Sequence, residues 1–154
     1  MIPEALYRQI VDALPVLCVD VALRNARGEY LLVKRANEPL KGAWWVIGGR
    51  VHKGETLVEA AVRKVKEEMG LDVPPDRLVC LGYYEDFFEQ NPLGVASGLH
   101  TLGVVFEAEI DGDCRARVDC QSDGWKFFDR LPDRLVIKPI AGGGRPGSPN
   151  PREG

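Results

Sequence analysis

The sequence lacks several features that would place it in a specialised class of proteins. Its four cysteines include no C-x-x-C pair, which disfavours a zinc site. No apolar run is long enough to cross a bilayer, and the first residues show no secretion signal. The formal net charge of -3 provides no excess of basic residues for binding a polyphosphate backbone. We therefore expect a cytoplasmic protein whose partners are neither nucleic acid nor membrane.

Length and composition fit one globular domain. The 154 residues are 45% hydrophobic and 28% charged, which are ordinary values for a chain with a single buried core. Residues 141–154 are dominated by Gly, Pro and Arg and show no hydrophobic pattern. We expect a single domain over residues 1–140, followed by a flexible tail over residues 141–154.

Hydrophobic periodicity predicts a mixed α/β fold. Apolar residues recur at helical spacing in Met1–Leu14 and more strongly in Thr56–Met69. The predicted strands are Val16–Leu23, Glu29–Arg35, Trp44–Ile47, Leu78–Tyr84, Leu102–Ile110 and Trp125–Phe128. The pair Gly48–Gly49 is expected to end the third strand ahead of the second helix. The segment Glu85–Leu99 is interpreted as a long loop that borders a ligand site.

The segment from Gly48 to Leu71 combines a glycine turn with a helix that presents Glu67 and Glu68. Carboxylates and backbone carbonyls are the hard oxygen ligands that Mg²⁺ prefers, and the ion completes its shell with waters and phosphate oxygens. Arg63 precedes Glu67 by four residues, so it can orient that carboxylate. The positive end of the helix, close to Gly49 in sequence, should favour a diphosphate. Taken alone, such a charge run is more often a solvated helix face.

The same segment resembles the Nudix box, whose pattern is G-x5-E-x7-R-E-U-x-E-E-x-G-U with U an aliphatic residue. The matching residues are Gly49, Glu55, Arg63, Val65, Glu67, Glu68, Gly70 and Leu71. The resemblance implies a Nudix fold, in which a mixed β-sheet is sandwiched between α-helices. It also implies a hydrolase of a small nucleotide-linked substrate that uses Mg²⁺, with Mn²⁺ as an alternative ion.

Lys64 departs from this pattern, because the box has a glutamate at that position. In many Nudix enzymes this glutamate is a metal ligand or the catalytic base. A lysine there removes a negative charge and adds a positive one beside Glu68, which disfavours a second or third Mg²⁺. The ammonium could instead reach a substrate phosphate. We therefore expect one essential Mg²⁺.

Beyond the box, the chain is similar to the GDP-mannose mannosyl hydrolases, which also lack the usual glutamate. The stretches that carry this resemblance are Val19–Leu23, Arg27–Arg35 and Gly42–Val51. The resemblance implies attack of water at the sugar carbon, with a diphosphate leaving group stabilised by the metal. It also suggests a homodimer.

Carried over residue by residue, this resemblance assigns roles to several positions. Substrate contacts are assigned to Asp20, Arg35, Arg50 and Trp44; catalytic roles to Arg35, Arg50 and Arg63; and metal ligation to Gly49, Glu67, Glu68 and Gln121. Trp44 and Trp45 alternate across a strand, so one of them is expected to stack on a base while the other packs in the core.

The catalytic base is the weakest point of the resemblance, because Ser122 stands where those enzymes have a histidine. A serine does not act as a base at neutral pH without help. His100 is the better candidate of the two histidines, although a structural role at a strand end is the more common one for such a residue. The carboxylates that remain as alternatives are Glu85, Asp86, Glu89 and Asp123.

The sequence thus predicts a Mg²⁺-dependent hydrolase of a nucleoside diphosphate sugar or a related nucleoside diphosphate derivative. Lys64 and Ser122 together keep open a second interpretation, a nucleotide-binding module with little turnover. A third is a nucleoside triphosphate pyrophosphohydrolase.

Overall fold

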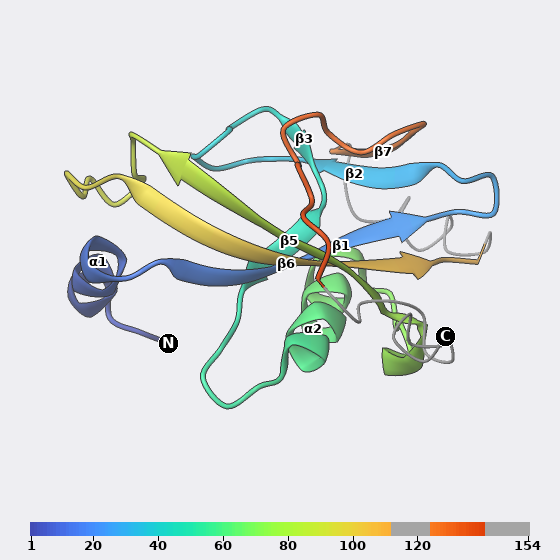
Figure 1. Cartoon of the computed structure of the whole chain (residues 1–154), viewed down its shortest axis with the longest axis horizontal. Coiled ribbons are helices and arrows are strands. Elements are labelled where there is room, and N and C mark those ends of the chain that lie inside the picture. Colours follow the sequence, from blue (N-terminus) through green and yellow to red (C-terminus); the bar gives the residue numbers. More distant parts are fainter. Residues whose placement is uncertain (112–123, 141–154) are drawn as a thin grey trace.

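The computed structural model describes residues 1–111 and 124–140. The described elements are α1 (Glu4–Ala13), β1 (Val16–Arg24), β2 (Tyr30–Lys34), β3 (Trp44–Trp45), β4 (Ile47–Arg50), α2 (Leu57–Met69), the short 3-10 helix η1 (Pro75–Arg77), β5 (Val79–Phe88), β6 (Leu99–Glu109) and β7 (Trp125–Phe128). The strands form one mixed sheet with the order β3-β2-β1-β6-β5, to which β4 and β7 are added alongside β1 and β2 (Figure 1). The predicted mixed α/β fold is confirmed.

Strand β1 organises the sheet. It runs parallel to β6 from the pair Val16–Thr101 to the pair Arg24–Glu109. On its other edge, its first half pairs with β4 and its last two residues pair with β2, both in antiparallel fashion. Because β4 and β2 use different parts of the same edge, the two strands diverge from β1 at its centre.

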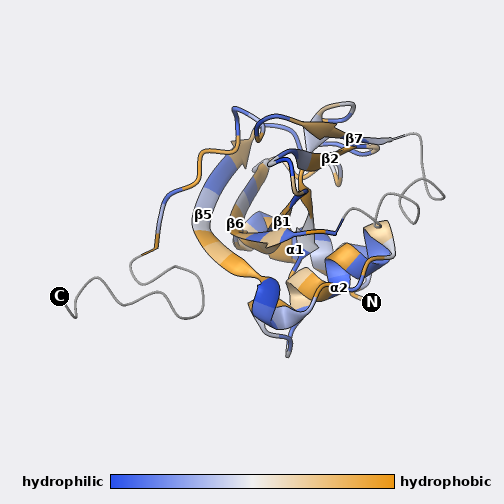
Figure 2. Ribbon diagram, turned by 90° about the vertical axis from the view of Figure 1, so that its right-hand side faces the viewer, coloured by the Kyte–Doolittle hydropathy of each residue, from blue (hydrophilic) through white to orange (hydrophobic). Residues whose placement is uncertain are grey.

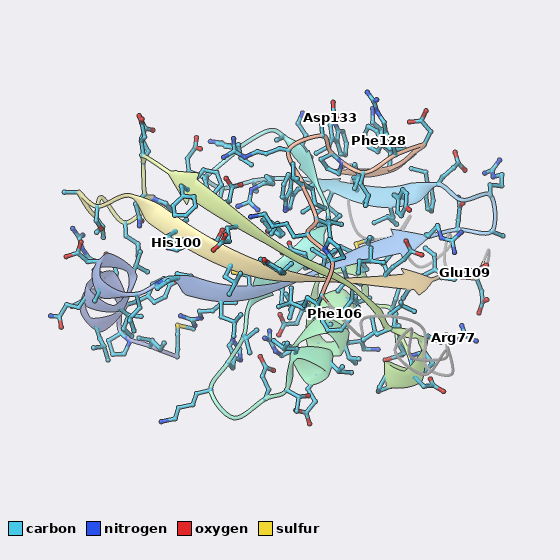
Figure 3. All side chains as sticks on the ribbon, viewed as in Figure 1. Arg77, His100, Phe106, Glu109, Phe128 and Asp133 are labelled. Carbon is cyan, nitrogen blue, oxygen red and sulfur yellow. The ribbon has the colours of Figure 1, made fainter. Side chains whose placement is uncertain are left out.

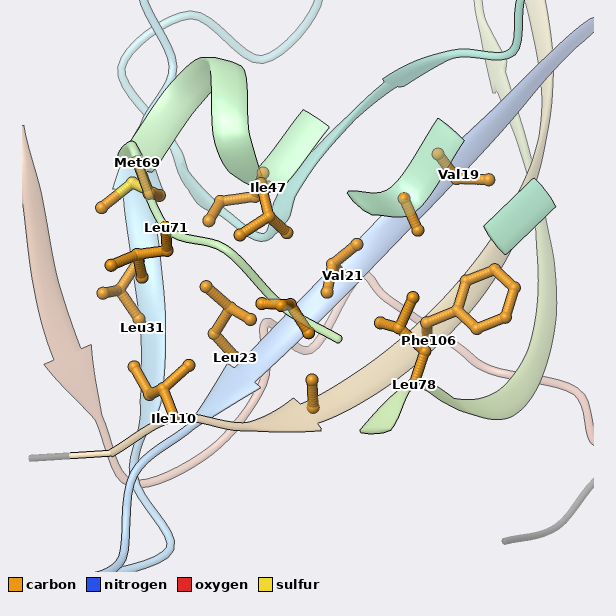
Figure 4. Packing of buried hydrophobic residues seen from close by; sticks show 14 of the residues in the cluster. Val19, Val21, Leu23, Leu31, Ile47, Met69, Leu71, Leu78, Phe106 and Ile110 are labelled. Atoms are coloured by element: carbon orange, nitrogen blue, oxygen red, sulfur yellow. The ribbon is translucent and has the colours of Figure 1, made fainter. Parts of the chain in front are cut away.

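The two faces of the sheet are covered by different parts of the chain. Helix α2 covers one face and buries Ala60, Ala61 and Val65 in the core cluster that includes Val19 and Val21 of β1. Figure 4 shows Met69 at the end of the helix among the residues of this core. The other face packs Trp45, Tyr84 and Val105 under the segment that follows β7. The residues of that segment that contact this second cluster are Leu131, Leu135 and Ile137. One face is thus covered by a helix and the other by extended chain.

Helix α2 has strong start and stop signals. Thr56 and Glu59 form a capping box, in which each side chain accepts from the backbone N–H of the other residue. Gly70 ends the helix in the left-handed conformation, at a φ of 67°. Hydrophobic and hydrophilic bands alternate along the helix beside the sheet (Figure 2). None of the helices in the described part of the chain has the length and apolarity needed to span a membrane.

Two expectations about local structure were wrong. Gly48 and Gly49 do not end a strand; both lie within β4 and pair with Asp20 and Val19 of β1. A side chain at Gly48 would collide with the Asp20 carboxylate and the Val19 carbonyl, so glycine permits this close pairing.

The segment Glu85–Leu99 is also not one long loop. Strand β5 continues to Phe88 and β6 begins at Leu99, so the connection spans only residues 89–98. Residues 85–88 lack the polar–apolar alternation typical of a strand, and their pairing with residues 99–102 of β6 is what makes them one.

Candidate active site

A cavity of about 730 Å³ opens where β2 and β4 diverge from β1. Strand β1 contributes Cys18 and Asp20, β4 contributes Gly48, Gly49 and Arg50, and the last turn of α2 contributes Glu68 and Met69. Five residues assigned to the site from sequence line this one cavity: Asp20, Arg35, Gly49, Arg50 and Glu68. The tertiary structure therefore brings together residues from four separate segments of the chain.

The basic part of the cavity consists of Arg35 and Arg50. The Arg35 Nε donates to the Pro39 carbonyl oxygen at 2.7 Å, which fixes the guanidinium against the loop after β2. The Arg50 guanidinium lies over the ring of Tyr7 from α1, with 4.6 Å between the guanidinium carbon and the ring centroid. One planar guanidinium group can bind two phosphate oxygens at once, so the two arginines of this cavity suit a diphosphate.

The acidic part consists of Glu68 and its neighbours. The Glu68 carboxylate accepts from the Gly48 backbone N–H and lies 3.1 Å from the Lys64 ammonium. Burial raises its pKa above the ordinary value of a glutamate, while Lys64 opposes that shift. The bond to Gly48 places Glu68 beside β4, the strand that carries Arg50, so that acidic and basic side chains line one cavity.

Glu67 lies at the edge of this arrangement. Its side chain is 49% exposed and is absent from the residues that line the cavity. It accepts from Lys64 and from Arg63, each at 3.3 Å, and these bonds lower its pKa. The prediction that Arg63 contacts Glu67 is confirmed.

Arg63 has a stronger attachment elsewhere. It donates twice to Glu55, at 2.6 and 3.0 Å, and its Nη2 also donates to the Arg50 carbonyl oxygen at 3.1 Å. The bonds from Arg63 lower the pKa of Glu55 to about 2. Arg63 thus ties the helix to the loop and to the end of β4, which fixes the backbone that carries Arg50 into the cavity.

The N-terminus of α2 is capped within its own first turn. The capping box already satisfies the backbone N–H groups of Thr56 and Glu59. Gly49 lies beside Lys64, on the third turn of the helix, and the cavity lining includes no residue from the first turn of α2. The cationic side chain that lies against Gly49 is that of Lys64.

The oxygen ligands that line the cavity suit one Mg²⁺ ion for which the protein supplies only a few of the ligands. Glu68 supplies a carboxylate, and the backbone of Gly49 lines the same cavity. Mg²⁺ commonly takes one or two carboxylates and fills its octahedron with waters and phosphate oxygens. Within residues 1–111 and 124–140, no three His, Cys, Asp or Glu side chains gather as a metal cluster. The described donor set therefore suits a single ion shared with a phosphorylated ligand.

Asp20 is the most unusual ionisable group of the cavity. Its side chain accepts from the Tyr84 hydroxyl at 2.8 Å and from the Trp45 indole N–H, and the residue is only 4% exposed. Burial raises its pKa to about 7, against the opposing effect of these two hydrogen bonds and of Arg35. Asp20 can therefore exchange a proton near neutral pH.

Several assigned residues lie outside the cavity. His100 is on β6, but its neighbours Leu99 and Thr101 line the cavity while His100 does not, because successive strand residues face opposite sides. His100 stacks on Phe87, with 4.2 Å between ring centroids, and its position on β6 is labelled in Figure 3. Trp44 likewise does not line the cavity, whereas Trp45 does. Trp44 instead packs against Phe128.

Some predicted residues cannot be placed. Gln121, Ser122 and Asp123, together with the tail over residues 141–154, lie outside the described residues. The assignment of Gln121 as a metal ligand stays a prediction.

Three cavity residues were missed by sequence reasoning. Tyr7 had been interpreted only as part of an amphipathic helix, and Cys18 as a buried strand residue. Lys34 precedes Arg35 and also lines the cavity. The only sequence signal for Cys18 is that side chains alternate between the two faces of a strand, which puts Cys18 on the same face as Asp20.

Comparison with known proteins agrees with this site. The NUDIX domain family model matches residues 14–138. The chain is 36% identical over 128 residues to the low-salt glycan biosynthesis protein Agl8 of Haloferax volcanii, covering 83% of this chain and 80% of that protein. It is also 36% identical over 116 residues to an ADP-ribose pyrophosphatase of Methanocaldococcus jannaschii, covering 75% of this chain and 62% of that protein.

A solved structure agrees as well. A MutT NUDIX hydrolase from Burkholderia pseudomallei superimposes with a TM-score of 0.61 at 26% identity, covering 80% of this chain and 91% of that one. The chain belongs to the NUDIX domain family. Its cavity and box segment are accordingly those of a Nudix hydrolase, and such enzymes generally use a divalent metal such as Mg²⁺.

Proposed function

We propose that this protein is a Mg²⁺-dependent hydrolase of a nucleoside diphosphate sugar or a related nucleoside diphosphate derivative, with Mn²⁺ as an alternative ion. The observation that carries the proposal is that Arg35 and Arg50 line the same cavity as Glu68 and Gly49. Two guanidinium groups and one metal-binding wall match the charge of a diphosphate. The names of two relatives, a glycan biosynthesis protein and an ADP-ribose pyrophosphatase, support a substrate in which a diphosphate carries a sugar.

In this proposal each wall of the cavity has a separate task. Arg35 and Arg50 bind and orient the diphosphate, and Arg63 holds the backbone that carries Arg50. Glu68 and Gly49 would hold the metal, which would supply positive charge to stabilise the leaving diphosphate. Trp45, which lines the cavity, is the aromatic residue assigned to border the substrate in place of Trp44.

Proton transfer is assigned to Asp20 and not to His100. Three carboxylates among the described residues line the cavity, namely Asp20, Glu68 and Asp86. Asp86 is held by two hydrogen bonds from Arg134, and Glu68 is assigned to the metal. Asp20 is left with a pKa of about 7, which suits a group that accepts a proton at neutral pH.

A substrate panel tests the proposal. GDP-mannose, ADP-ribose and dGTP are incubated with the protein and Mg²⁺, and the products are identified by mass spectrometry. Hydrolysis of a diphosphate sugar is the expected result. Release of pyrophosphate from dGTP as the dominant reaction would instead show a nucleoside triphosphate pyrophosphohydrolase. Reaction in ¹⁸O-labelled water then locates the attack, because label in a phosphate product shows attack at phosphorus and label in the sugar shows attack at carbon.

A binding module with little turnover remains a second candidate, because Lys64 forms ion pairs with both Glu67 and Glu68. The substitution Glu68→Gln separates the two functions. Loss of turnover by at least about a hundredfold with unchanged folding supports the hydrolase, since loss of a functional metal-site contact commonly costs 10–100-fold or more. Glu109→Gln, at an exposed position at the end of β6 labelled in Figure 3, is the matched control and should keep full activity. Ligand binding without turnover in all three proteins would favour the module.

The homodimer, the cytoplasmic location and the single domain over residues 1–140 stay predictions. Size-exclusion chromatography with light scattering measures the first of these directly.

A further inference from the structure

Lys64 lies between the groups that are assigned to the metal. Its ammonium is 3.1 Å from a Glu68 oxygen and 3.3 Å from a Glu67 oxygen. The Lys64 side chain is only 18% exposed, less than either glutamate. A hypothetical Cβ on Gly49 would lie 2.8 Å from the Lys64 Cε and 3.2 Å from its Nζ, so the side chain also lies directly against Gly49. One ammonium therefore contacts or borders all three described groups assigned to the metal.

The local charges show what this ammonium does. Glu55, Glu67 and Glu68 are carboxylates of the box segment, and Arg63 and Lys64 pair with them. Arg63 is committed to Glu55 and shares Glu67. Among the described residues, the cation that pairs with Glu68 is Lys64. Without Lys64, the Glu68 carboxylate would lose this ion pair.

We propose that Lys64 is a resident cation of this site, which holds Glu67 and Glu68 in place of a metal ion and must be displaced before Glu68 can bind one. This inference rests on the proposed function, since it concerns the metal wall of the same cavity. A half-buried ammonium between two carboxylates repels a divalent ion strongly, because both charges are poorly screened there. The folded protein therefore binds Mg²⁺ or Mn²⁺ weakly in the absence of substrate.

Glycine at position 49 is part of this arrangement. The side chain of Lys64 occupies the space that a Cβ at Gly49 would take, so the strand and the lysine fit together only because position 49 lacks a side chain. The lysine stem packs along β4 while its ammonium reaches the carboxylates, as long cationic side chains commonly do. Lys64 is thus built into the site and is not a loose surface residue.

The test measures metal binding without substrate. Free Mn²⁺ is counted by electron paramagnetic resonance during titration of the full chain and of the variants Lys64→Gln and Lys64→Glu. Lys64→Gln should bind Mn²⁺ at least about tenfold more tightly than the wild type, a factor that corresponds to about 1.4 kcal/mol. Lys64→Glu should bind more tightly still, because it adds a carboxylate.

Lys66→Glu is the matched control. It makes the same change of charge on the same helix, but Lys66 is 55% exposed and pairs with Asp72 at 2.9 Å, away from the cavity lining. Its Mn²⁺ affinity should stay within about twofold of the wild type, as expected for a screened surface charge. An equal gain in Lys66→Glu and Lys64→Glu would show a general charge effect and overturn the inference.

Thermal unfolding gives an independent measurement. Addition of Mn²⁺ should raise the Tm of Lys64→Gln and Lys64→Glu more than that of the wild type, because a ligand stabilises the folded state by RT ln(1 + [L]/Kd), which grows as Kd falls. If Lys64→Glu fails to fold, Lys64→Gln carries the test alone.

Wild-type Mn²⁺ affinity equal to that of Lys64→Gln would overturn the inference and leave the hydrolase proposal untouched. Conversely, a failed substrate panel with the expected Mn²⁺ affinities would refute the hydrolase and leave the resident cation standing.

Discussion

The substitution Asp20→Asn should change how the stability of the protein depends on pH. Asp20 is buried and its pKa is raised from 3.8 to about 7. Between these values the folded state keeps the proton while the unfolded state has released it. Stability therefore falls as pH rises through this window, and the loss is complete above the folded pKa. Three pKa units at about 1.36 kcal/mol each give a loss of about 4 kcal/mol.

Asparagine has nearly the shape of the neutral carboxyl group and does not ionise. The variant should therefore match the wild type near pH 4 and become more stable than it by up to about 4 kcal/mol near pH 8. Tyr84 and Trp45 still find an acceptor in the amide oxygen, although only one oxygen then serves both donors. The comparison between two proteins at each pH cancels the titration of other groups.

Urea unfolding followed by tryptophan fluorescence, in EDTA and at several pH values from 4 to 8, measures this difference. The control Asp133→Asn changes a carboxylate that is 84% exposed and labelled in Figure 3, and its difference from the wild type should not vary with pH. If the free-energy difference for Asp20→Asn stays constant across this range, burial does not control the ionisation of Asp20. A difference of opposite slope would show that the hydrogen bonds from Tyr84 and Trp45 outweigh burial and hold the group ionised.

Three further predictions concern single residues. Thr56→Ala should lower the free energy of unfolding by about 1 kcal/mol, because it removes one half of the capping box with Glu59, whereas Thr56→Ser should restore it in urea unfolding. Gly103→Ala should cost about 1–3 kcal/mol, because its Cβ would overlap the Tyr84 ring, and an unchanged Tm would contradict that packing. Burial raises the pKa of Cys18 to about 12. Alkylation by iodoacetamide at pH 8, measured by peptide mass spectrometry, should therefore be on the order of a thousandfold slower in the folded protein than in the urea-unfolded protein. Equal rates would show an accessible thiolate.

The sequence was most informative where local signals agree. The helix over Thr56–Met69 was predicted almost to the residue, because a capping box, a helical apolar stripe and Gly70 mark its start, face and end. The strand over Trp125–Phe128 also has the predicted bounds. These elements carry their signals in residues that are neighbours along the chain.

Sequence reasoning was weakest where a strand depends on its partner. Gly48 and Gly49 have low strand propensity, yet they pair with β1 because the absence of side chains admits Asp20 and Lys64. Residues 85–88 contain two acids and two aromatics, and only the ladder with β6 makes them a strand. Tertiary pairing overrides local preference at such positions.

The assignment of site residues divides in the same way. A motif of fixed spacing identified Arg63, Glu67 and Glu68 as a group, and the helical period places Arg63 and Glu67 on one face. Spacing alone could not show that Glu68 faces the cavity while Glu67 faces solvent, or that Glu55 is the main partner of Arg63. Those facts depend on how α2 lies against β4.

The sequence by itself thus determined the family, the main helix and the chemical character of the metal-binding segment, because these follow from residues close together in the chain. Only the tertiary structure decided that Arg35, Arg50, Asp20 and Glu68 share one cavity, since they lie on separate elements that meet around β1. It also placed His100 on the other side of β6 and the Lys64 ammonium between two carboxylates. Burial and contact with distant residues set the pKa of Asp20 and the partners of Lys64, and neither is encoded in local spacing.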